Sequence, residues 1–327
     1  SDATGHFRDP QIFQYKEHYY AIVGGQNLDK KGFIRLYSAI NNDYTNWKEI
    51  GNLDFNNDGT AYMMECPNLV FVDEKPVLIY CPQGLDKNVF PYDNIYPNLY
   101  KIGEKFDPEN ATITPVSELH QLDYGFDVYA TQAFNAPDGR VLCISWLGLP
   151  DVSYPSDIYE HQGIFSLVKE LSLKDGKLYQ TPVKGIEKLR QSSLPFNKYI
   201  KNTSNCYELN LKLEGEMVHE LILFSDKDGN GLSLIFNLVD GEVVVDRSKV
   251  GENFATEFSS VRTAPIAPAD TTARIFIDNS VFEIFINDGE MVFSGRVFPR
   301  EDQTHISILQ GDPTGVYYPL LTFTNPN

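Results

Sequence analysis

The sequence predicts an all-β protein built in two parts, and three observations support this prediction. Helical periodicity is almost absent along the 327 residues. Short runs of β-branched and aromatic residues alternate with turn signals at intervals of about ten residues. Aromatic residues make up 13% of the chain, a content that suits strands and sugar-stacking surfaces better than a helical bundle.

The first part of the chain has the pattern of strands joined by tight turns. Residues 13–23 predict two strands that meet at Lys16-Glu17-His18. Residues 69–80 predict a hairpin about Asp73-Glu74-Lys75, and a further strand pair flanks Pro137-Asp138-Gly139. This spacing is typical of a sandwich, a barrel or a propeller, and the pattern leaves the three alternatives open.

The pattern changes between the two parts. Residues 166–180 predict one more hairpin. Residues 186–193 are polar and lack strand alternation, which indicates a linker or a short helix. We therefore divide the chain into a first domain at 1–185, a linker at 186–203 and a second domain at 204–327.

From residue 204 onward apolar residues alternate regularly, as in strands that bury one face. The turn Asn287-Asp288-Gly289 favours a tight hairpin because these residue types accept positive φ at low cost. The second domain is therefore predicted to be a β-sandwich that ends near Phe323. Its alternating apolar residues are Tyr207, Leu209, Leu211, Leu213, Leu232, Leu234, Phe236, Leu238, Ile275, Ile277, Phe282, Ile284 and Ile286.

The composition limits the partners of the protein. A net charge of -18 disfavours nucleic acid and anionic lipid as general partners. It does not exclude a small anionic substrate, because a local Lys/Arg cluster acts at short range. No apolar run approaches the ~18 residues that a membrane span needs, and no signal peptide opens the sequence. Cys66, Cys81, Cys143 and Cys206 form no C-x-x-C pair and are expected to be free thiols in a cytoplasmic protein.

No motif in the sequence indicates a metal or a cofactor. Residues 226–231 begin like a calcium loop, but Asn237 occupies the position of the bidentate Glu, so a turn between strands is the better interpretation. His219-Glu220 lacks the second histidine of a zinc-binding helix, and no glycine-rich phosphate loop occurs. We therefore expect neither a metal nor a cofactor.

Three segments of the first domain carry polar residues that neither a plain strand nor a turn requires. Taken singly, each has a structural explanation: Arg8-Asp9 as a surface ion pair, Glu65 as a solvated acid, and Trp146 as a core residue. Asp127 is explained in the same way, as the cap of a turn. The segments are His6-Phe7-Arg8-Asp9-Pro10, Tyr62-Met63-Met64-Glu65-Cys66-Pro67-Asn68 and Asp123-Tyr124-Gly125-Phe126-Asp127-Val128-Tyr129-Ala130, and Ser145-Trp146-Leu147-Gly148 follows them.

Taken together, the segments resemble glycoside hydrolase family 32. That family carries an Arg-Asp-Pro motif, a Glu-Cys motif, a Tyr-Ala motif after an Asp-Tyr-Gly stretch, and a Trp-x-Gly motif, and this sequence has all four in that order. Residues 81–85 and 147–151 resemble the bacterial intracellular branch of the family, and residues 281–290 resemble its C-terminal sandwich. The resemblance covers the whole chain.

The resemblance implies a five-bladed β-propeller followed by a β-sandwich, with a sugar site at the axial end of the propeller. It implies hydrolysis of β-fructofuranosyl bonds with retention, on sucrose 6-phosphate or sucrose, with short fructans as a further alternative. Glu65 would be the general acid/base, and Asp9, assisted by Arg8, would stabilise the oxocarbenium-like transition state. The remaining substrate-binding candidates are Cys66, Trp146, Asp123 and Tyr129.

One feature departs from the family pattern. The family's nucleophile is an Asp in a Trp-Met-Asn-Asp-Pro-Asn-Gly motif, and this sequence contains no such motif. We therefore expect an incomplete propeller and no fructosidase activity of this chain by itself. An incomplete propeller exposes sheet edges, so self-association through such an edge is also expected. The alternative to an enzyme is a non-catalytic carbohydrate-binding or scaffold protein derived from this family.

Overall fold

The computed structural model describes residues 2–57, 59–196, 198–201 and 203–322. Nearly all regular structure in this part of the chain is β-strand, and the exceptions are four short 3-10 helices. The all-β prediction is therefore confirmed. None of the helices among these residues is long and apolar enough to span a bilayer.

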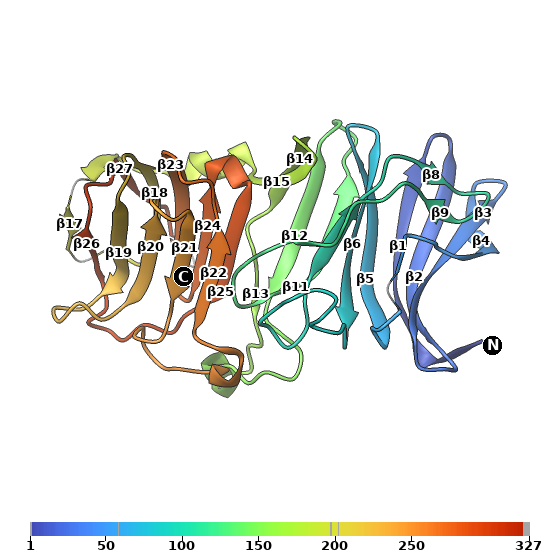
Figure 1. The fold of residues 1–327 in the computed structure, drawn as a ribbon, viewed down its shortest axis with the longest axis horizontal. Coiled ribbons are helices and arrows are strands. Elements are labelled where there is room, and N and C mark those ends of the chain that lie inside the picture. The colour runs from blue at the N-terminus through green and yellow to red at the C-terminus, as the bar shows by residue number, and fades with distance from the viewer. Residues whose placement is uncertain (1, 58, 197, 202, 323–327) are drawn as a thin grey trace, which may run out of the picture. The chain divides into compact units, whose positions relative to one another are not determined.

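The chain divides into two compact units, whose strands are labelled in Figure 1. The first unit comprises residues 1–122, 128–149 and 168–178. The second comprises residues 123–127, 150–167 and 179–327. The Asp123-to-Asp127 stretch thus belongs to the second unit, whereas Val128 and Tyr129 belong to the first.

The first unit is built from three antiparallel sheets, and in each sheet the strand that comes first in the chain lies at an edge (Figure 1). The orders are β1-β2-β3-β4, β5-β6-β7-β10 and β11-β12-β14-β15, and β8 pairs with β9 separately. Four antiparallel strands in succession form the blade of a β-propeller. The bounds are β1 Ala3–Tyr15, β2 His18–Asn27, β3 Gly32–Ile40, β4 Asp43–Asn52, β5 Met63–Val72, β6 Lys75–Gln83, β7 Leu99–Ile102, β8 Phe106–Asp107, β9 Thr112–Ile113, β10 His120–Gln121, β11 Val128–Asn135, β12 Val141–Leu147, β14 Lys169–Lys174 and β15 Lys177–Pro182.

The middle sheet of the first unit is buried on both faces. In β5, Leu69 packs in one hydrophobic cluster, while its neighbour Val70 packs in another on the opposite face. Leu78 and Ile79 of β6 divide between the same two clusters. Because both faces are covered, these strands appear in the sequence as continuous apolar runs. The hairpin predicted about residues 73–75 is present, with Val72 opposite Lys75.

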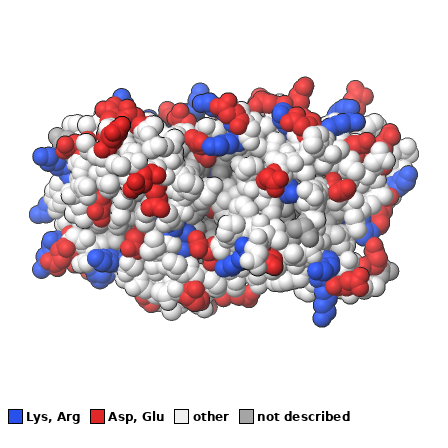
Figure 2. All heavy atoms as spheres, in the orientation of Figure 1, with Lys and Arg blue, Asp and Glu red and all other residues white. Residues whose placement is uncertain are grey.

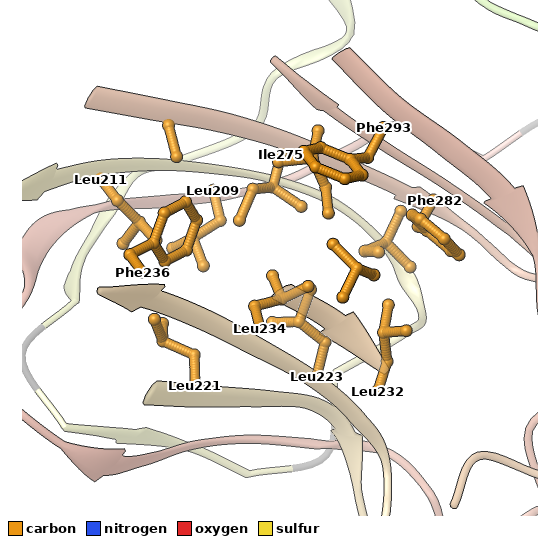
Figure 3. Packing of buried hydrophobic residues seen from close by; sticks show 14 of the residues in the cluster. Leu209, Leu211, Leu221, Leu223, Leu232, Leu234, Phe236, Ile275, Phe282 and Phe293 are labelled. Atoms are coloured by element: carbon orange, nitrogen blue, oxygen red, sulfur yellow. The ribbon is translucent and has the colours of Figure 1, made fainter. Parts of the chain in front are cut away.

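The second unit contains two six-stranded antiparallel sheets among its described residues, which confirms the predicted β-sandwich. Their orders are β16-β27-β18-β23-β24-β25 and β17-β26-β19-β20-β21-β22. Figure 3 shows side chains of both sheets, among them Leu209, Leu234 and Phe236, meeting in one core. The bounds are β16 Leu194–Phe196, β17 Tyr199–Ile200, β18 Cys206–Leu213, β19 Val218–Ser225, β20 Leu232–Asn237, β21 Glu242–Asp246, β22 Val261–Pro265, β23 Thr271–Asp278, β24 Val281–Ile286, β25 Met291–Arg296, β26 His305–Gln310 and β27 Thr314–Pro319. The smaller elements are β13 Ile164–Phe165, η1 Pro155–Tyr159, η2 Lys184–Leu189, η3 Thr256–Phe258 and η4 Asn287–Gly289.

The predicted alternation and turn of the second unit are both found. All thirteen alternating apolar residues named above are buried. The turn after β24 has φ of 49° at Asn287, 58° at Asp288 and 86° at Gly289. A Cβ at position 289 would lie 1.9 Å from the carbonyl oxygen of Gln180, so this glycine also permits a close backbone approach.

The segment predicted as a linker is partly sheet, which corrects the 186–203 boundary. Its first residues lie in η2, as the short-helix alternative expected. Further along, β16 pairs with β27 and β17 pairs with β26, so both are edge strands of the sandwich. These strands have three and two residues, too few to show an alternating pattern in the sequence. The predicted end of the domain near Phe323 lies outside the described residues.

A buried ion pair anchors the segment 123–127 within the second unit. Asp127 is fully buried and accepts hydrogen bonds from Arg247 Nη1 at 2.9 Å, Tyr154 Oη at 2.8 Å and the Arg296 backbone N–H at 2.8 Å. The Arg247 guanidinium lies 4.2 Å from the Phe126 ring centroid and 4.3 Å from that of Phe254. Asp127 therefore has a structural role, as the simple interpretation of this residue expected.

Replacing Asp127 by Ala should strongly destabilise the second unit, because Arg247 would remain buried without its carboxylate. We expect a loss of about 3–5 kcal/mol in the free energy of unfolding. Urea denaturation, followed by far-ultraviolet circular dichroism, measures this loss. Asp138→Ala, which breaks an exposed ion pair with Arg140, is the matched control and should change stability little. Equal losses in the two variants would contradict this account of Asp127.

Candidate active site

Three strands of the first unit are kinked at the same relative place. The register of pairing shifts between Arg8 and Gln11 in β1, between Glu65 and Asn68 in β5, and between Tyr129 and Gln132 in β11. Within each shift one residue adopts positive φ: 62° at Asp9, 46° at Cys66 and 49° at Ala130. A β-bulge of this kind turns side chains away from the regular alternation. The kinks fall on the Arg-Asp, Glu-Cys and Tyr-Ala motifs.

Amide side chains join these three edge strands to one another. Gln11 Nε2 donates to the carbonyl oxygens of Leu69 at 3.3 Å and Ala133 at 3.0 Å, while its Oε1 accepts from Leu69 N at 2.7 Å. Asn135 exchanges two hydrogen bonds with the backbone of Phe71, at 3.0 and 2.6 Å. Strands β1, β5 and β11 therefore lie next to one another, and the residues at their kinks can form one site.

Glu65 is held at both carboxylate oxygens. Its side chain is 12% exposed, and Oε1 accepts hydrogen bonds from Arg8 through Nε at 2.8 Å and through Nη2. Oε2 accepts a hydrogen bond of 2.5 Å from Tyr129 Oη. Burial, followed by the neighbouring Cys81 and Glu65, raises the pKa of the Tyr129 hydroxyl, so this group stays protonated and remains a donor. Two donors from two other strands thus fix the orientation of the carboxylate.

Asp9 lies next to Cys66 rather than in an ion pair with Arg8. Its Oδ2 accepts hydrogen bonds from Cys66 N at 3.0 Å and Cys66 Sγ at 3.6 Å. Burial and then the Asp9 and Glu65 carboxylates raise the pKa of the Cys66 thiol, which therefore stays protonated and donates. Among the described residues Asp9 Oδ1 has no hydrogen-bond partner, so this oxygen is available to a ligand.

Trp146 lies next to Tyr129, the residue of β11 that donates to Glu65. It lies directly opposite Tyr129 in the pairing of β11 with β12, and its side chain is half-buried. Gly148 packs against the indole, because a Cβ at position 148 would lie 2.4 Å from Trp146 Cε2. The Trp-x-Gly motif therefore has a steric basis: the glycine makes room for the tryptophan ring.

Two further tyrosines join the group, and sequence reasoning did not select them. Tyr62 Oη donates to Tyr96 Oη at 3.2 Å, and the ring of Tyr96 lies 6.1 Å from that of Tyr129. Tyr96 comes from the long loop between β6 and β7, which has no regular structure around it. The available signal was compositional, since this loop contains three aromatic residues, Phe90, Tyr92 and Tyr96.

The hydrogen bonds of Asp123 to Ser294 and Gly125 lie within the second unit. Asp123 is 3% exposed and accepts hydrogen bonds from Ser294 N at 2.9 Å, Ser294 Oγ at 2.7 Å and Gly125 N at 2.7 Å. Its carboxylate thus binds backbone and hydroxyl donors of its own unit. That Asp123 borders the sugar site stays a prediction.

All four cysteines are free in the structure, as predicted. Among the described residues no three His, Cys, Asp or Glu side chains are grouped so that they could hold a metal ion. Figure 2 shows acidic and basic side chains interspersed over the visible face, without a continuous basic surface of the kind that binds nucleic acid.

Comparison with known proteins gives consistent matches to one family. The model of the glycosyl hydrolases family 32 N-terminal domain matches residues 1–182, and that of the family 32 C-terminal domain matches residues 174–317. Sucrose-6-phosphate hydrolase of Streptococcus mutans is 56% identical over 98% of this chain and 67% of its own length. The enzyme of the same name from Lactococcus lactis is 44% identical over 94% of this chain and 63% of its own length.

Solved structures give the same result. Sucrose-6-phosphate hydrolase from Lactobacillus gasseri superposes with a TM-score of 0.94 at 42% identity, covering 98% of this chain and 67% of that one. A Bombyx mori family 32 β-fructofuranosidase, solved as a mutant in complex with sucrose, superposes with a TM-score of 0.81 at 29% identity, over 97% of this chain and 66% of that one. The chain thus spans about two thirds of the length of these relatives.

We predict that Cys66 reacts slowly with iodoacetamide although it is only partly buried. The raised thiol pKa leaves little thiolate at pH 8, so alkylation should be at least about tenfold slower than in urea-unfolded protein. Peptide mass spectrometry after timed quenching resolves each cysteine. Asp9→Asn removes one carboxylate beside the thiol and should accelerate the reaction. A native rate at Cys66 equal to the unfolded rate would contradict the assigned hydrogen bond to Asp9.

Proposed function

Because the chain belongs to glycosyl hydrolase family 32, we propose that it carries the acid/base part of a site that hydrolyses β-fructofuranosyl bonds with retention. The observation that carries this proposal is the Glu65 carboxylate, oriented by Arg8 and Tyr129 beside the Asp9–Cys66 pair. A carboxyl group held at both oxygens is suited to pass a proton at one defined position.

Each group then has a defined part in the reaction. In the first step protonated Glu65 gives its proton to the bridging oxygen while a second carboxylate, the nucleophile, bonds to the fructosyl carbon; the bond from that carbon to the bridging oxygen breaks, and its electron pair goes to the leaving group. In the second step the Glu65 carboxylate takes a proton from water, whose oxygen bonds to the same carbon; the bond to the nucleophile breaks, and its electron pair returns to that carboxylate. Arg8 and Tyr129 donate hydrogen bonds to Glu65 and thereby fix the position at which its carboxyl group passes the proton.

Asp9 and the aromatic residues would bind the sugar. Positive charge develops on the fructosyl ring in the transition state, and the Asp9 carboxylate opposes it while its Oδ1 accepts from a sugar hydroxyl. The half-buried indole of Trp146 offers an apolar wall to the furanose ring. Tyr62 and Tyr96 add hydroxyls next to Tyr129 that suit a polyhydroxylated ligand.

The covalent step needs a second carboxyl group about 5–5.5 Å from the acid/base. Asp9 is assigned to transition-state stabilisation, and the family's nucleophile motif does not occur in the printed sequence. We therefore propose that these 327 residues alone bind fructosides without hydrolysing them. Calorimetry with fructose and a glucose-release assay with sucrose test the two halves of this statement. Sucrose hydrolysis by this chain alone would contradict it.

The acid/base role of Glu65 is tested in a fructoside-hydrolysing protein that contains this chain. Glu65→Ala should lower kcat on sucrose by about 10²–10⁴-fold. Azide should restore turnover of β-fructosyl fluoride and yield fructosyl azide, because neither the leaving group nor the nucleophile then needs proton transfer. Glu17 lies in the turn between β1 and β2, away from the kink at Asp9. Glu17→Ala is therefore the matched control and should leave kcat unchanged. An absence of azide rescue in an otherwise folded Glu65→Ala variant would remove Glu65 from this role.

We further propose sucrose 6-phosphate as the preferred substrate over sucrose, which agrees with the names of the bacterial relatives. A phosphate needs a cation near the site. Lys87 is our candidate, because its loop leaves β6 at the end where Glu65 pairs with Cys81. Its Nζ lies 4.9 Å from the ring centroid of Tyr92 in the same loop.

In a fructoside-hydrolysing protein that contains this chain, Lys87→Ala should raise KM for sucrose 6-phosphate by roughly tenfold, as expected for the loss of one charge contact with phosphate, and leave KM for sucrose unchanged. Lys75→Ala is the control, since Lys75 lies at the far end of the β5–β6 hairpin and pairs with Glu104. Steady-state kinetics with both substrates measure the difference. Equal changes in KM for the two sugars would rule out Lys87 as a phosphate ligand.

A further inference from the structure

One buried side chain contacts the backbone next to two of the three kinks. Asn68 of β5 is 1% exposed. Its Nδ2 donates to the carbonyl oxygen of Cys66 at 2.9 Å and to that of Thr131 at 2.9 Å. Its Oδ1 accepts from Ala133 N at 2.9 Å. The amide thus spans the kinked segments of both β5 and β11.

These contacts lie directly beside Glu65 and Tyr129, which are hydrogen-bonded to each other in the site. Cys66 is the kinked residue that follows Glu65, and Thr131 follows the kinked Ala130 next to Tyr129. The Glu65 Oε2–Tyr129 Oη hydrogen bond joins the same two strands at 2.5 Å. Holding the backbone on the C-terminal side of both residues therefore sets the distance between their side chains.

The geometry requires an amide. Two N–H groups must meet two carbonyl oxygens while one oxygen meets a backbone N–H, and the asparagine side chain supplies this combination. An aspartate would face both carbonyls with an acceptor, and an aliphatic side chain would leave three buried backbone groups without partners.

A second layer of buried polar groups supports the contact on the side of β11. Thr131 Oγ1 donates to Asn98 Oδ1 at 2.7 Å and lies 2.8 Å from Ser145 Oγ. Thr131, Asn98 and Ser145 are all at most 3% exposed. Since Ser145 precedes Trp146, this network extends from Asn68 to the strand that carries the tryptophan.

We propose that Asn68 is a positioning residue that couples Glu65 to Tyr129 by fixing the two backbone kinks. Its effect on catalysis rests on the function proposed above, whereas its effect on the kinks does not. Asn135 gives a matched comparison, because it also bridges β5 and β11 but does so at Phe71, away from the kinks.

The first measurement follows the Cys66 kink without any activity. Site-resolved alkylation by iodoacetamide is compared in the wild type and in the Asn68→Ala, Asn68→Ser and Asn135→Ala variants. Loss of the bond to the Cys66 carbonyl should release the thiol from Asp9 and raise its alkylation rate about tenfold in Asn68→Ala, less in Asn68→Ser, and not in Asn135→Ala. Cys81 and Cys143, both buried, should stay unreactive and show that each variant is folded.

An unchanged Cys66 rate in a folded Asn68→Ala variant, or an equal increase in Asn135→Ala, would overturn the proposal. If Asn68→Ala does not fold, the comparison of Asn68→Ser with Asn135→Ala decides in the same way.

The second measurement is a double-mutant cycle on kcat in a fructoside-hydrolysing protein that contains this chain. Tyr129→Phe should lower kcat by about 10-fold or more in the wild type and much less in the Asn68→Ala background, because the coupling is already lost there. In the Asn135→Ala background the effect of Tyr129→Phe should be that of the wild type. Identical effects of Tyr129→Phe in all three backgrounds would overturn the coupling. A protein in which Glu65→Ala keeps full activity would instead refute the proposed function and leave the alkylation result standing.

Discussion

The site depends on one backbone constraint, the positive φ of Asp9, Cys66 and Ala130 in three neighbouring edge strands. A residue with a side chain pays on the order of 1–3 kcal/mol to adopt such a conformation, so the surrounding structure must hold it there. Without the three kinks, the regular alternation of β1, β5 and β11 would direct successive side chains to opposite faces. The kinks instead bring Arg8, Glu65 and Tyr129 within hydrogen-bonding distance.

The cost of the three kinks is offset by side chains that make the same hydrogen bonds as the backbone of a neighbouring strand. An edge strand leaves N–H and C=O groups without partners, and a primary amide offers both a donor and an acceptor of the same type. Gln11, Asn68 and Asn135 fill this role at successive levels of the three strands. On the C-terminal side of the kinks the strands are therefore cross-linked by hydrogen bonds from side-chain amides to the backbone, whereas at the kinks Arg8, Glu65 and Tyr129 orient one another.

Much of the fold follows from local pattern, whereas the kinks leave only a faint signal. The sandwich strands alternate because each buries one face, and the hairpin at residues 73–75 lies between runs buried on both faces. The kinks interrupt the alternation over single residues, and their visible sign is proline: Pro10 and Pro67 stand inside strands, where proline is confined to edges and bulges. In β11 the kinked residue is Ala130 and no proline marks it.

The contacts of the candidate site residues could not be predicted from the sequence, for equally physical reasons. Asp123 and Glu65 are both acids within motif-like segments, and only the fold shows that Asp123 binds Ser294 while Glu65 binds Arg8 and Tyr129. Tyr96 comes from a loop without periodicity, so no pattern could align it with β11. Residue type therefore indicated candidate groups, and long-range contacts decided which partners each of them has.

The contact between Gly148 and Trp146 has a consequence for how the site can vary. The indole is held by van der Waals contact with a position that has no side chain, and no charge or hydrogen bond is involved in that contact. A methyl group at position 148 would overlap the indole of Trp146 and displace the ring. The polar groups of Glu65, Asp9 and Tyr129 would stay in place. The position of the Trp146 ring thus depends on the volume at a single position of the chain, and not on the hydrogen bonds that orient Glu65.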